Sequence, residues 1–119
     1  MWLSLNGVKG NKIIKVISKI KPVNGRLEKV GSLLDKSIVI LDFAHTPEAL
    51  KKCLLSLREQ FKFSNISIVF GCGGERDKQK RKTMGKIANE YCNKIYLTDD
   101  NPRKENPKKI RSQIKINIE

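Results

Sequence analysis

Residues 66–77 run Ile66-Ser67-Ile68-Val69-Phe70-Gly71-Cys72-Gly73-Gly74-Glu75-Arg76-Asp77, an apolar segment rich in β-branched residues that passes directly into a glycine-rich loop. A helical pattern follows, from about Lys80 to Tyr91. A second apolar segment, residues 95–98, leads into Asp99-Asp100-Asn101-Pro102-Arg103, and Asn106-Pro107 opens another helical pattern. This alternation of strand and helix predicts a parallel sheet with right-handed crossovers.

The same alternation extends toward the N-terminus. Residues 37–42 form an unbroken apolar run, Ser37-Ile38-Val39-Ile40-Leu41-Asp42, which predicts a strand buried on both faces. Thr46-Pro47 predicts the start of a helix, with Thr46 as its N-cap. Residues 26–30 alternate like a short strand. The predicted fold class is therefore α/β, with a Rossmann-like, open and mostly parallel sheet.

One helix is expected before this sheet, because isoleucines recur at helical spacing from Ile13 to Ile20 and Pro22 ends the pattern. The turn that follows Pro22 predicts a boundary, which divides the chain into residues 1–23 and residues 24–119. The last helical pattern reaches the end of the chain without a cap or a following strand. We therefore expect residues 24–119 to be a truncated domain.

The composition limits the classes of function. A net charge of +13 would suit a nucleic-acid-binding protein, but the basic residues are scattered and only 6% of residues are aromatic. A solvated basic surface is the preferred interpretation, and no nucleic acid is expected as a partner. Three cysteines and one histidine predict neither a disulfide framework nor a metal site. Without a signal peptide or a membrane-length apolar run, the expected location is the cytoplasm.

Two loops are the candidate binding site, because the carboxyl ends of parallel strands are where α/β proteins bind ligands. Each loop holds an arginine, Arg76 or Arg103, together with carboxylates, as a zwitterionic ligand would require. The glycines of residues 71–74 suit either a phosphate-binding turn or a tight turn without a ligand, and both interpretations stay open. His45 is either structural or a neutral donor and acceptor, and Asp42 is either a capping carboxylate or a ligand contact at the same sheet edge.

Four blocks carry a more specific signal: Asp42 to Leu50, Phe70 to Lys78, Arg81 with Met84-Gly85, and Asp99 to Arg103. In this order they resemble the C-terminal domain of the Mur ligases, in particular of those that use meso-diaminopimelate. Residues 21–28 resemble the junction between the central and C-terminal domains of that family. The resemblance implies that residues 1–23 are a helical remnant of the central ATPase domain with its linker, and that residues 24–119 are part of the C-terminal domain.

The resemblance also implies roles for single residues. Asp100, Asn101, Pro102 and Arg103 match the motif that recognises meso-diaminopimelate, and Arg76 matches an arginine that contacts the same ligand. The positions that match the nucleotide side of the family's site are Arg26, Asp42 and His45. No residue of the chain is assigned a catalytic role or a metal.

The activity implied by the resemblance is ATP- and Mg-dependent formation of an amide bond between meso-diaminopimelate and UDP-MurNAc-L-Ala-D-Glu, a step of peptidoglycan synthesis. The sequence holds no Gly-Lys-Thr phosphate loop. We therefore expect a fragment that binds the amino acid and one side of ATP, and that is inactive alone. The alternatives are a binding-only module with a separate ATPase partner and a basic nucleic-acid-binding protein.

Overall fold

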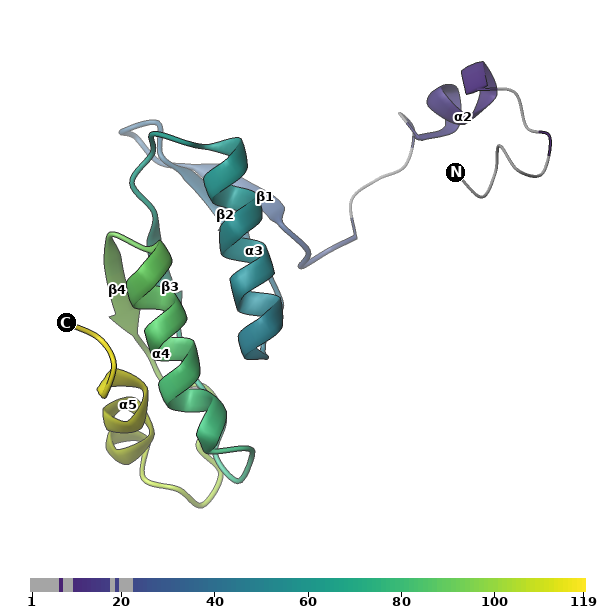
Figure 1. The fold of residues 1–119 in the computed structure, drawn as a ribbon. Coiled ribbons are helices and arrows are strands. Elements are labelled where there is room, and N and C mark those ends of the chain that lie inside the picture. Colours follow the sequence, from purple (N-terminus) through teal and green to yellow (C-terminus); the bar gives the residue numbers. More distant parts are fainter. Residues whose placement is uncertain (1–6, 8–9, 18, 20–22) are drawn as a thin grey trace. The chain divides into compact units, whose positions relative to one another are not determined.

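The computed structural model describes residue 7, residues 10–17, residue 19 and residues 23–119. Its helices and strands, labelled in Figure 1, follow one another as α2 (Gly10–Ile17), β1 (Glu28–Ser32), β2 (Ile38–Leu41), α3 (Pro47–Gln60), β3 (Ser67–Phe70), α4 (Gln79–Tyr91), β4 (Lys94–Leu97) and α5 (Pro107–Lys115). The chain divides into two compact units, residues 1–42 and residues 43–119. No helix of the described residues has the length and apolarity needed to cross a membrane.

The first unit holds α2 and an antiparallel pair of strands. Helix α2 confirms the expected N-terminal helix over Gly10–Ile17, and none of its described residues is buried. The expected continuation to Ile20 and Pro22 lies outside the described residues. Strand β1 pairs with β2 from Glu28 opposite Leu41 to Ser32 opposite Ile38.

Strand β2 corrects one prediction from the sequence. The apolar run of residues 37–42 was expected to be buried on both faces within the parallel sheet, but β2 pairs with β1 in an antiparallel sheet of two strands. Ile38, Val39 and Leu41 are 42%, 39% and 53% exposed. A short turn after Ser32 suffices for β2 to pair with β1 in the antiparallel direction.

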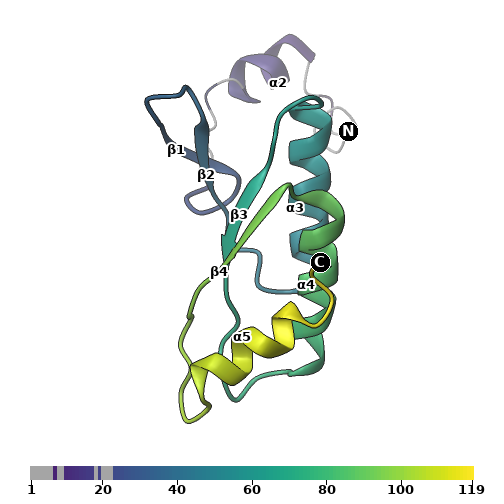
Figure 2. The same ribbon diagram turned by 90° about the vertical axis from the view of Figure 1, so that its left-hand side faces the viewer.

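The second unit is built on a parallel pair of strands. Strand β3 pairs with β4 in register, with Ile68 opposite Ile95, and helix α4 forms the crossover between them. Helices α3 and α4 lie side by side on one face of these strands, and α5 packs beside α4 (Figures 1 and 2). This arrangement confirms the α/β fold class with a parallel sheet.

Local chemistry sets where α3 and α5 begin. Thr46 accepts a hydrogen bond at Oγ1 from the amide of Ala49 (3.2 Å), which confirms it as the N-cap of α3. Asn106 caps α5 in the same way, because its Oδ1 accepts from the amide of Lys108 (2.9 Å). In both helices a proline follows the cap, where its missing N–H is not needed.

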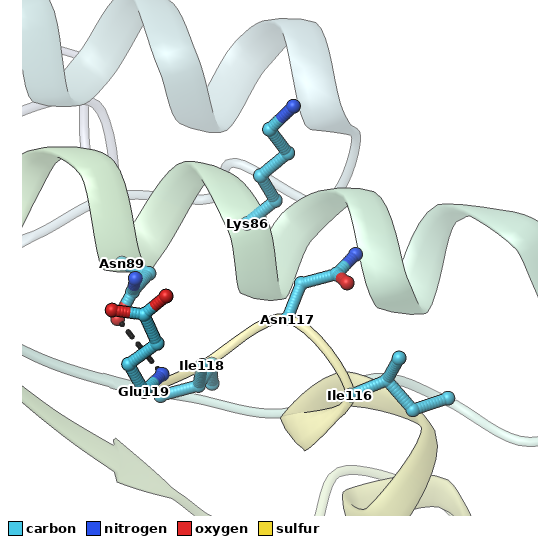
Figure 3. A pocket seen from close by; sticks show the side chains of 6 residues that line it. All are labelled: Lys86, Asn89, Ile116, Asn117, Ile118 and Glu119. Carbon is cyan, nitrogen blue, oxygen red and sulfur yellow. Dashed lines mark hydrogen bonds between the residues drawn. The ribbon is translucent and has the colours of Figure 1, made fainter.

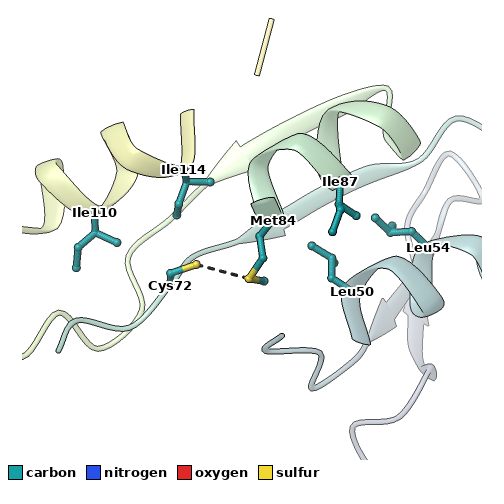
Figure 4. Packing of buried hydrophobic residues seen from close by; sticks show 7 residues of the cluster. All are labelled: Leu50, Leu54, Cys72, Met84, Ile87, Ile110 and Ile114. Carbon is teal, nitrogen blue, oxygen red and sulfur yellow. Dashed lines mark hydrogen bonds between the residues drawn. The ribbon is translucent and has the colours of Figure 1, made fainter. Parts of the chain in front are cut away.

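The core of the second unit lies between its helices and the parallel strands. Figure 4 shows the buried side chains, which are Leu50 and Leu54 of α3, Cys72 of the loop after β3, Met84 and Ile87 of α4, and Ile110 and Ile114 of α5. The predicted inward face of α4 is confirmed, since Met84, Ile87 and Ala88 are buried and Tyr91 is half-buried.

Gly85 allows α4 and α5 to approach closely. A Cβ atom built at Gly85 would lie 2.0 Å from the carbonyl oxygen of Ile114, far inside van der Waals contact. The backbone of α5 therefore occupies the space that any larger residue at this position would need.

We expect Gly85→Ala to lower the free energy of unfolding by about 1–3 kcal/mol, because the added methyl group overpacks the contact between α4 and α5. The better helix propensity of alanine offsets at most about 1 kcal/mol of this loss. Urea unfolding followed by circular dichroism measures the change. Gly10→Ala in α2 is the matched control, because a Cβ there meets nothing within 4 Å. Equal losses in both variants would contradict the close packing at Gly85.

Candidate functional site

Two loops meet beyond the carboxyl ends of β3 and β4. We call residues 71–78, which follow β3, the glycine loop, and residues 98–106, which follow β4, the Asn-Pro loop. The amide of Gly74 donates to the carbonyl oxygen of Asn101 (2.8 Å), and Arg103 Nη1 donates to the carbonyl oxygen of Gly74 (2.7 Å). The structure thus brings together the two loops that the sequence placed at one sheet edge.

The loops lie so close that two positions require glycine. A Cβ atom at Gly71 would lie 2.4 Å from the carbonyl oxygen of Thr98, and one at Gly74 would lie 1.9 Å from the carbonyl oxygen of Pro102. Both obstacles are backbone atoms, which a side-chain rotation cannot move away. The glycines are therefore needed for contact between the loops, whichever ligand the loops bind.

Arg103 is anchored by its own loop. Its backbone has a φ of +49°, and its amide donates to Oδ1 of Asn101 (3.1 Å), while the amide of Asn101 donates to Oδ1 of Asp100 (2.6 Å). The described hydrogen bonds of the guanidinium group use Nη1 alone, and the residue is exposed. The edge formed by Nε and Nη2 is therefore available to bind a carboxylate through two parallel hydrogen bonds.

The buried side chain of Arg81 forms an ion pair with the half-buried Glu105 of the Asn-Pro loop, which was not predicted from the sequence. Arg81 of α4 is fully buried and donates from Nη1 and Nη2 to the two carboxylate oxygens of Glu105 (2.8 and 2.9 Å). The same guanidinium donates to the carbonyl oxygen of Gly73 (3.0 Å) and to Oε1 of Gln113 in α5 (2.6 Å). Arg81 thus joins the glycine loop, the Asn-Pro loop and α5.

Two signals in the sequence point to this pair. Arg81 lies three and seven residues before Met84 and Ala88, on the predicted inward face of α4, where a charge must find a partner. Glu105 is the only acidic residue between Asn101 and Ile118. Neither signal identifies Glu105 as the partner of Arg81, because the two residues are 24 positions apart.

Glu105 also holds the glycine loop directly. Its Oε1 accepts from the amide of Glu75 (2.6 Å), a residue with a φ of +51°, and Lys78 Nζ lies 4.0 Å from Oε2. The hydrogen bonds from Arg81, and then the one from the Glu75 amide, lower the pKa of Glu105 to about 2. The same pairing raises the pKa of Arg81 above its ordinary value. The carboxylate therefore stays ionised at neutral pH.

The remaining predicted residues of the amino-acid site lie on the surface of the two loops. Arg76 is exposed in the glycine loop, and within the described part of the chain its side chain makes no hydrogen bond or ion pair. Asp100 and Asn101 are exposed and Pro102 is half-buried. Asp99 forms an ion pair with Arg111 of α5, which fixes the start of the Asn-Pro loop.

The three residues expected on a nucleotide side belong to different units. Arg26 and Asp42 lie in the first unit, where Oδ2 of Asp42 accepts from the amide of Leu27 (2.9 Å). Asp42 follows β2, which pairs with β1 in the antiparallel sheet and is not hydrogen-bonded to β3 or β4. His45 lies in the second unit, is exposed, and its carbonyl oxygen accepts from Lys80 Nζ (2.8 Å).

The described residues do not fit a magnesium ion by themselves. Across residue 7, residues 10–17, residue 19 and residues 23–119, no group of three or more His, Cys, Asp or Glu side chains is placed to hold a metal. A cavity of about 430 Å³ lies between α4 and the segment after α5, as Figure 3 shows. It is lined by Lys86, Asn89, Ile116, Asn117, Ile118 and Glu119, none of which belongs to the two loops.

Comparison with known proteins gives a consistent set of similarities. Residues 25–119 match the family model described as "Mur ligase, glutamate ligase domain". The UDP-N-acetylmuramoyl-L-alanyl-D-glutamate–2,6-diaminopimelate ligase of Rickettsia felis is 46% identical over 110 residues, which are 92% of this chain and 20% of that protein. The ligase of the same name from Anaplasma marginale is 44% identical over 103 residues, or 87% of this chain and 21% of that protein.

A solved structure of a ligase with this name superimposes with a TM-score of 0.70 at 33% identity, over 98% of this chain and 23% of that one. The chain thus spans about a fifth of the length of the relatives it matches.

We expect the pairing of Glu105 with Arg81 to make the free energy of unfolding depend on pH in the acidic range. Its pKa is about 2 in the folded chain against a usual 4.5, so the unfolded state binds more protons between these values. The contribution of the Glu105 pairing to the free energy of unfolding is complete above about pH 4.5 and falls as the pH approaches about 2. Glu105→Gln should therefore be less stable than the wild type at pH 7, by a margin that narrows in acid.

Urea unfolding at a series of pH values measures this margin. Glu59→Gln, which removes one exposed carboxylate from α3, is the matched control and should follow the wild type. A difference between Glu105→Gln and the wild type that stays constant from pH 7 to pH 3 would contradict the assignment.

Proposed function

The chain belongs to the Mur ligase family, whose glutamate ligase domain it carries in residues 25–119, and from this we propose that it binds the amino-acid substrate of a peptidoglycan ligase. The proposed reaction is the ATP-dependent addition of meso-diaminopimelate to UDP-MurNAc-L-Ala-D-Glu. The names of the relatives, which are 2,6-diaminopimelate ligases, support this substrate. Because the chain spans about a fifth of their length, we assign the ATPase part of the reaction to polypeptide outside residues 1–119.

The observation that most supports the proposal is the anchored guanidinium of Arg103. Its Nη1 is held by Gly74, and the edge of Nε and Nη2 is left for a carboxylate. Meso-diaminopimelate differs from lysine by one additional carboxylate, which such an edge binds bidentately. Arg76, exposed in the neighbouring loop, supplies a second positive charge for the same ligand.

The carboxylate and amide side chains of the Asn-Pro loop complete the proposed site. Asp100 is exposed and suits an ammonium group of the ligand, while Asn101 uses its Oδ1 to hold the amide of Arg103. Pro102 stiffens the turn between them. These residues bind and orient the amine that forms the new bond, and positioning is the contribution that an already activated acyl group requires.

The nucleotide side of the proposal rests on the resemblance of Arg26, Asp42 and His45 to family positions. ATP and magnesium, when bound to the complete ligase, supply the activation of the D-glutamyl carboxylate. Among the described residues, no group of three or more His, Cys, Asp or Glu side chains is placed to hold the metal. The cytoplasm, where nucleotide-linked precursors and ATP are present together, is the proposed location.

A variant of this proposal is a binding-only module that works with a separately encoded ATPase. Mixing the chain with a ligase that lacks its own C-terminal domain distinguishes the two forms, since only a module that acts in trans would restore the product.

We expect meso-diaminopimelate to shift the amide NMR signals of residues 71–77, 99–101 and 103 in the full chain, and L-lysine to bind at least about tenfold more weakly. Arg103→Ala should weaken binding of meso-diaminopimelate by about ten- to a hundredfold, the loss of a charge-assisted contact of about 1.5–3 kcal/mol. Arg103→Lys separates charge from geometry, because it keeps the charge without the bidentate edge.

Lys104→Ala is the matched control for Arg103→Ala. Lys104 is the next residue, is exposed, and carries the same charge. If Lys104→Ala weakens binding as much as Arg103→Ala, or if L-lysine shifts the loop signals as strongly as meso-diaminopimelate, the role assigned to Arg103 is wrong.

A further inference from the structure

We infer that Arg81 and Glu105 are positioning residues of the amino-acid site, whose ion pair sets the separation of the glycine loop and the Asn-Pro loop and thereby the affinity for the ligand. This inference rests on the proposed function for the identity of the ligand. The geometry of the pair itself does not depend on that assignment.

The pair closes a ring of contacts between the two loops. Starting at the carbonyl oxygen of Gly73, the ring passes through Arg81 Nη2 (3.0 Å) to Glu105 Oε1 (2.9 Å) and then to the amide of Glu75 (2.6 Å). The amide of Glu105 in turn donates to the carbonyl oxygen of Pro102 (2.9 Å). The segments directly before and after Gly74 are therefore held by these two side chains, and the backbone amide of Glu105 holds the residue before Arg103.

Burial separates this role from direct binding. Arg81 is fully buried, so it cannot contact a ligand on the surface of the loops. Arg103 Nη1 donates to the carbonyl oxygen of the buried Gly74 at 2.7 Å, so Arg103 moves with the backbone that Arg81 and Glu105 hold. A change in the pair displaces the available edge of Arg103 relative to Arg76, and a misplacement of this kind weakens binding of a bidentate ligand.

The chain contains a second arginine clamp that serves as an internal control. Arg58 of α3 donates from Nε and Nη2 to the carbonyl oxygen of Tyr91 (2.9 and 2.7 Å) and from Nη1 to that of Ser64 (2.8 Å). Its Nη2 also donates to Oδ1 of Asn93 (2.9 Å), which accepts from the amide of Ile66. This clamp lies where β3 and β4 begin, at the opposite end of the strands from the two loops.

The experiment compares Arg81→Lys and Glu105→Asp with Arg58→Lys in the full chain. All three variants keep their charge and lose the geometry of the clamp, so all three should lose stability. Binding of meso-diaminopimelate, measured by amide NMR at a temperature where each variant is folded, should weaken at least about tenfold in Arg81→Lys and Glu105→Asp. In Arg58→Lys the dissociation constant should stay within about twofold of the wild type, because distant sites act independently.

A purely structural role predicts a different result. If Arg58→Lys weakens binding as much as the other two variants, or if none of the folded variants binds more weakly than the wild type, the positioning role is overturned. If only one of Arg81→Lys and Glu105→Asp folds, the dissociation constant of that variant is compared with the dissociation constant of Arg58→Lys.

Hydrogen exchange separates failure of this inference from failure of the proposed function. The amides of Gly74 and Glu75 should exchange faster in Glu105→Asp than in the wild type, while the amides of Ile66 and Asn93 should not change. If meso-diaminopimelate shifts no loop signal of the wild type, the proposed function is wrong, and the exchange rates still decide the positioning role. If the amides of Gly74 and Glu75 are protected from exchange equally in Glu105→Asp and in the wild type, the positioning role is overturned.

Discussion

A buried guanidinium group is the constraint on which the second unit depends. A charge removed from water destabilises a fold unless it is paired and hydrogen-bonded, and Arg81 meets this requirement only with partners from three separate segments. Within the described part of the chain its Nε alone has no partner. The glycine loop, the Asn-Pro loop and α5 must therefore all be in place before this side chain is stable in the core. Gly85, four residues further along α4, allows the backbone of α5 to come close enough for this.

The exposed surface of the site follows from the parallel pair of strands. Because β3 and β4 run in the same direction, the loops that leave them begin side by side, and glycine at positions 71 and 74 allows their backbones to touch. Arg103 then serves two purposes with one guanidinium group, since one nitrogen holds the neighbouring loop and the opposite edge faces no described partner. A ligand would thus meet a surface that is already organised, which reduces the cost of ordering on binding.

Much of the fold could be predicted from local sequence, because the signals are local. Thr46-Pro47 and Asn106-Pro107 cap helices through contacts within three residues, and the inward face of α4 follows from apolar spacing. The apolar run of β2 was assigned to the wrong sheet because hydrophobicity does not specify which strand is the partner. The site was predicted in part: the loops and Arg103 have local signals, whereas the Arg81–Glu105 pair depends on a tertiary contact across 24 positions.

The same separation along the chain sets an order of assembly. Both strands, the glycine loop and Arg103 are complete by residue 103, yet the counter-ion of Arg81 comes at residue 105 and its amide partner at residue 113. During synthesis the earlier segments would emerge first with an unpaired arginine on the inner face of α4. The geometry of the site therefore depends on the docking of α5, which brings Gln113 to the guanidinium group of Arg81.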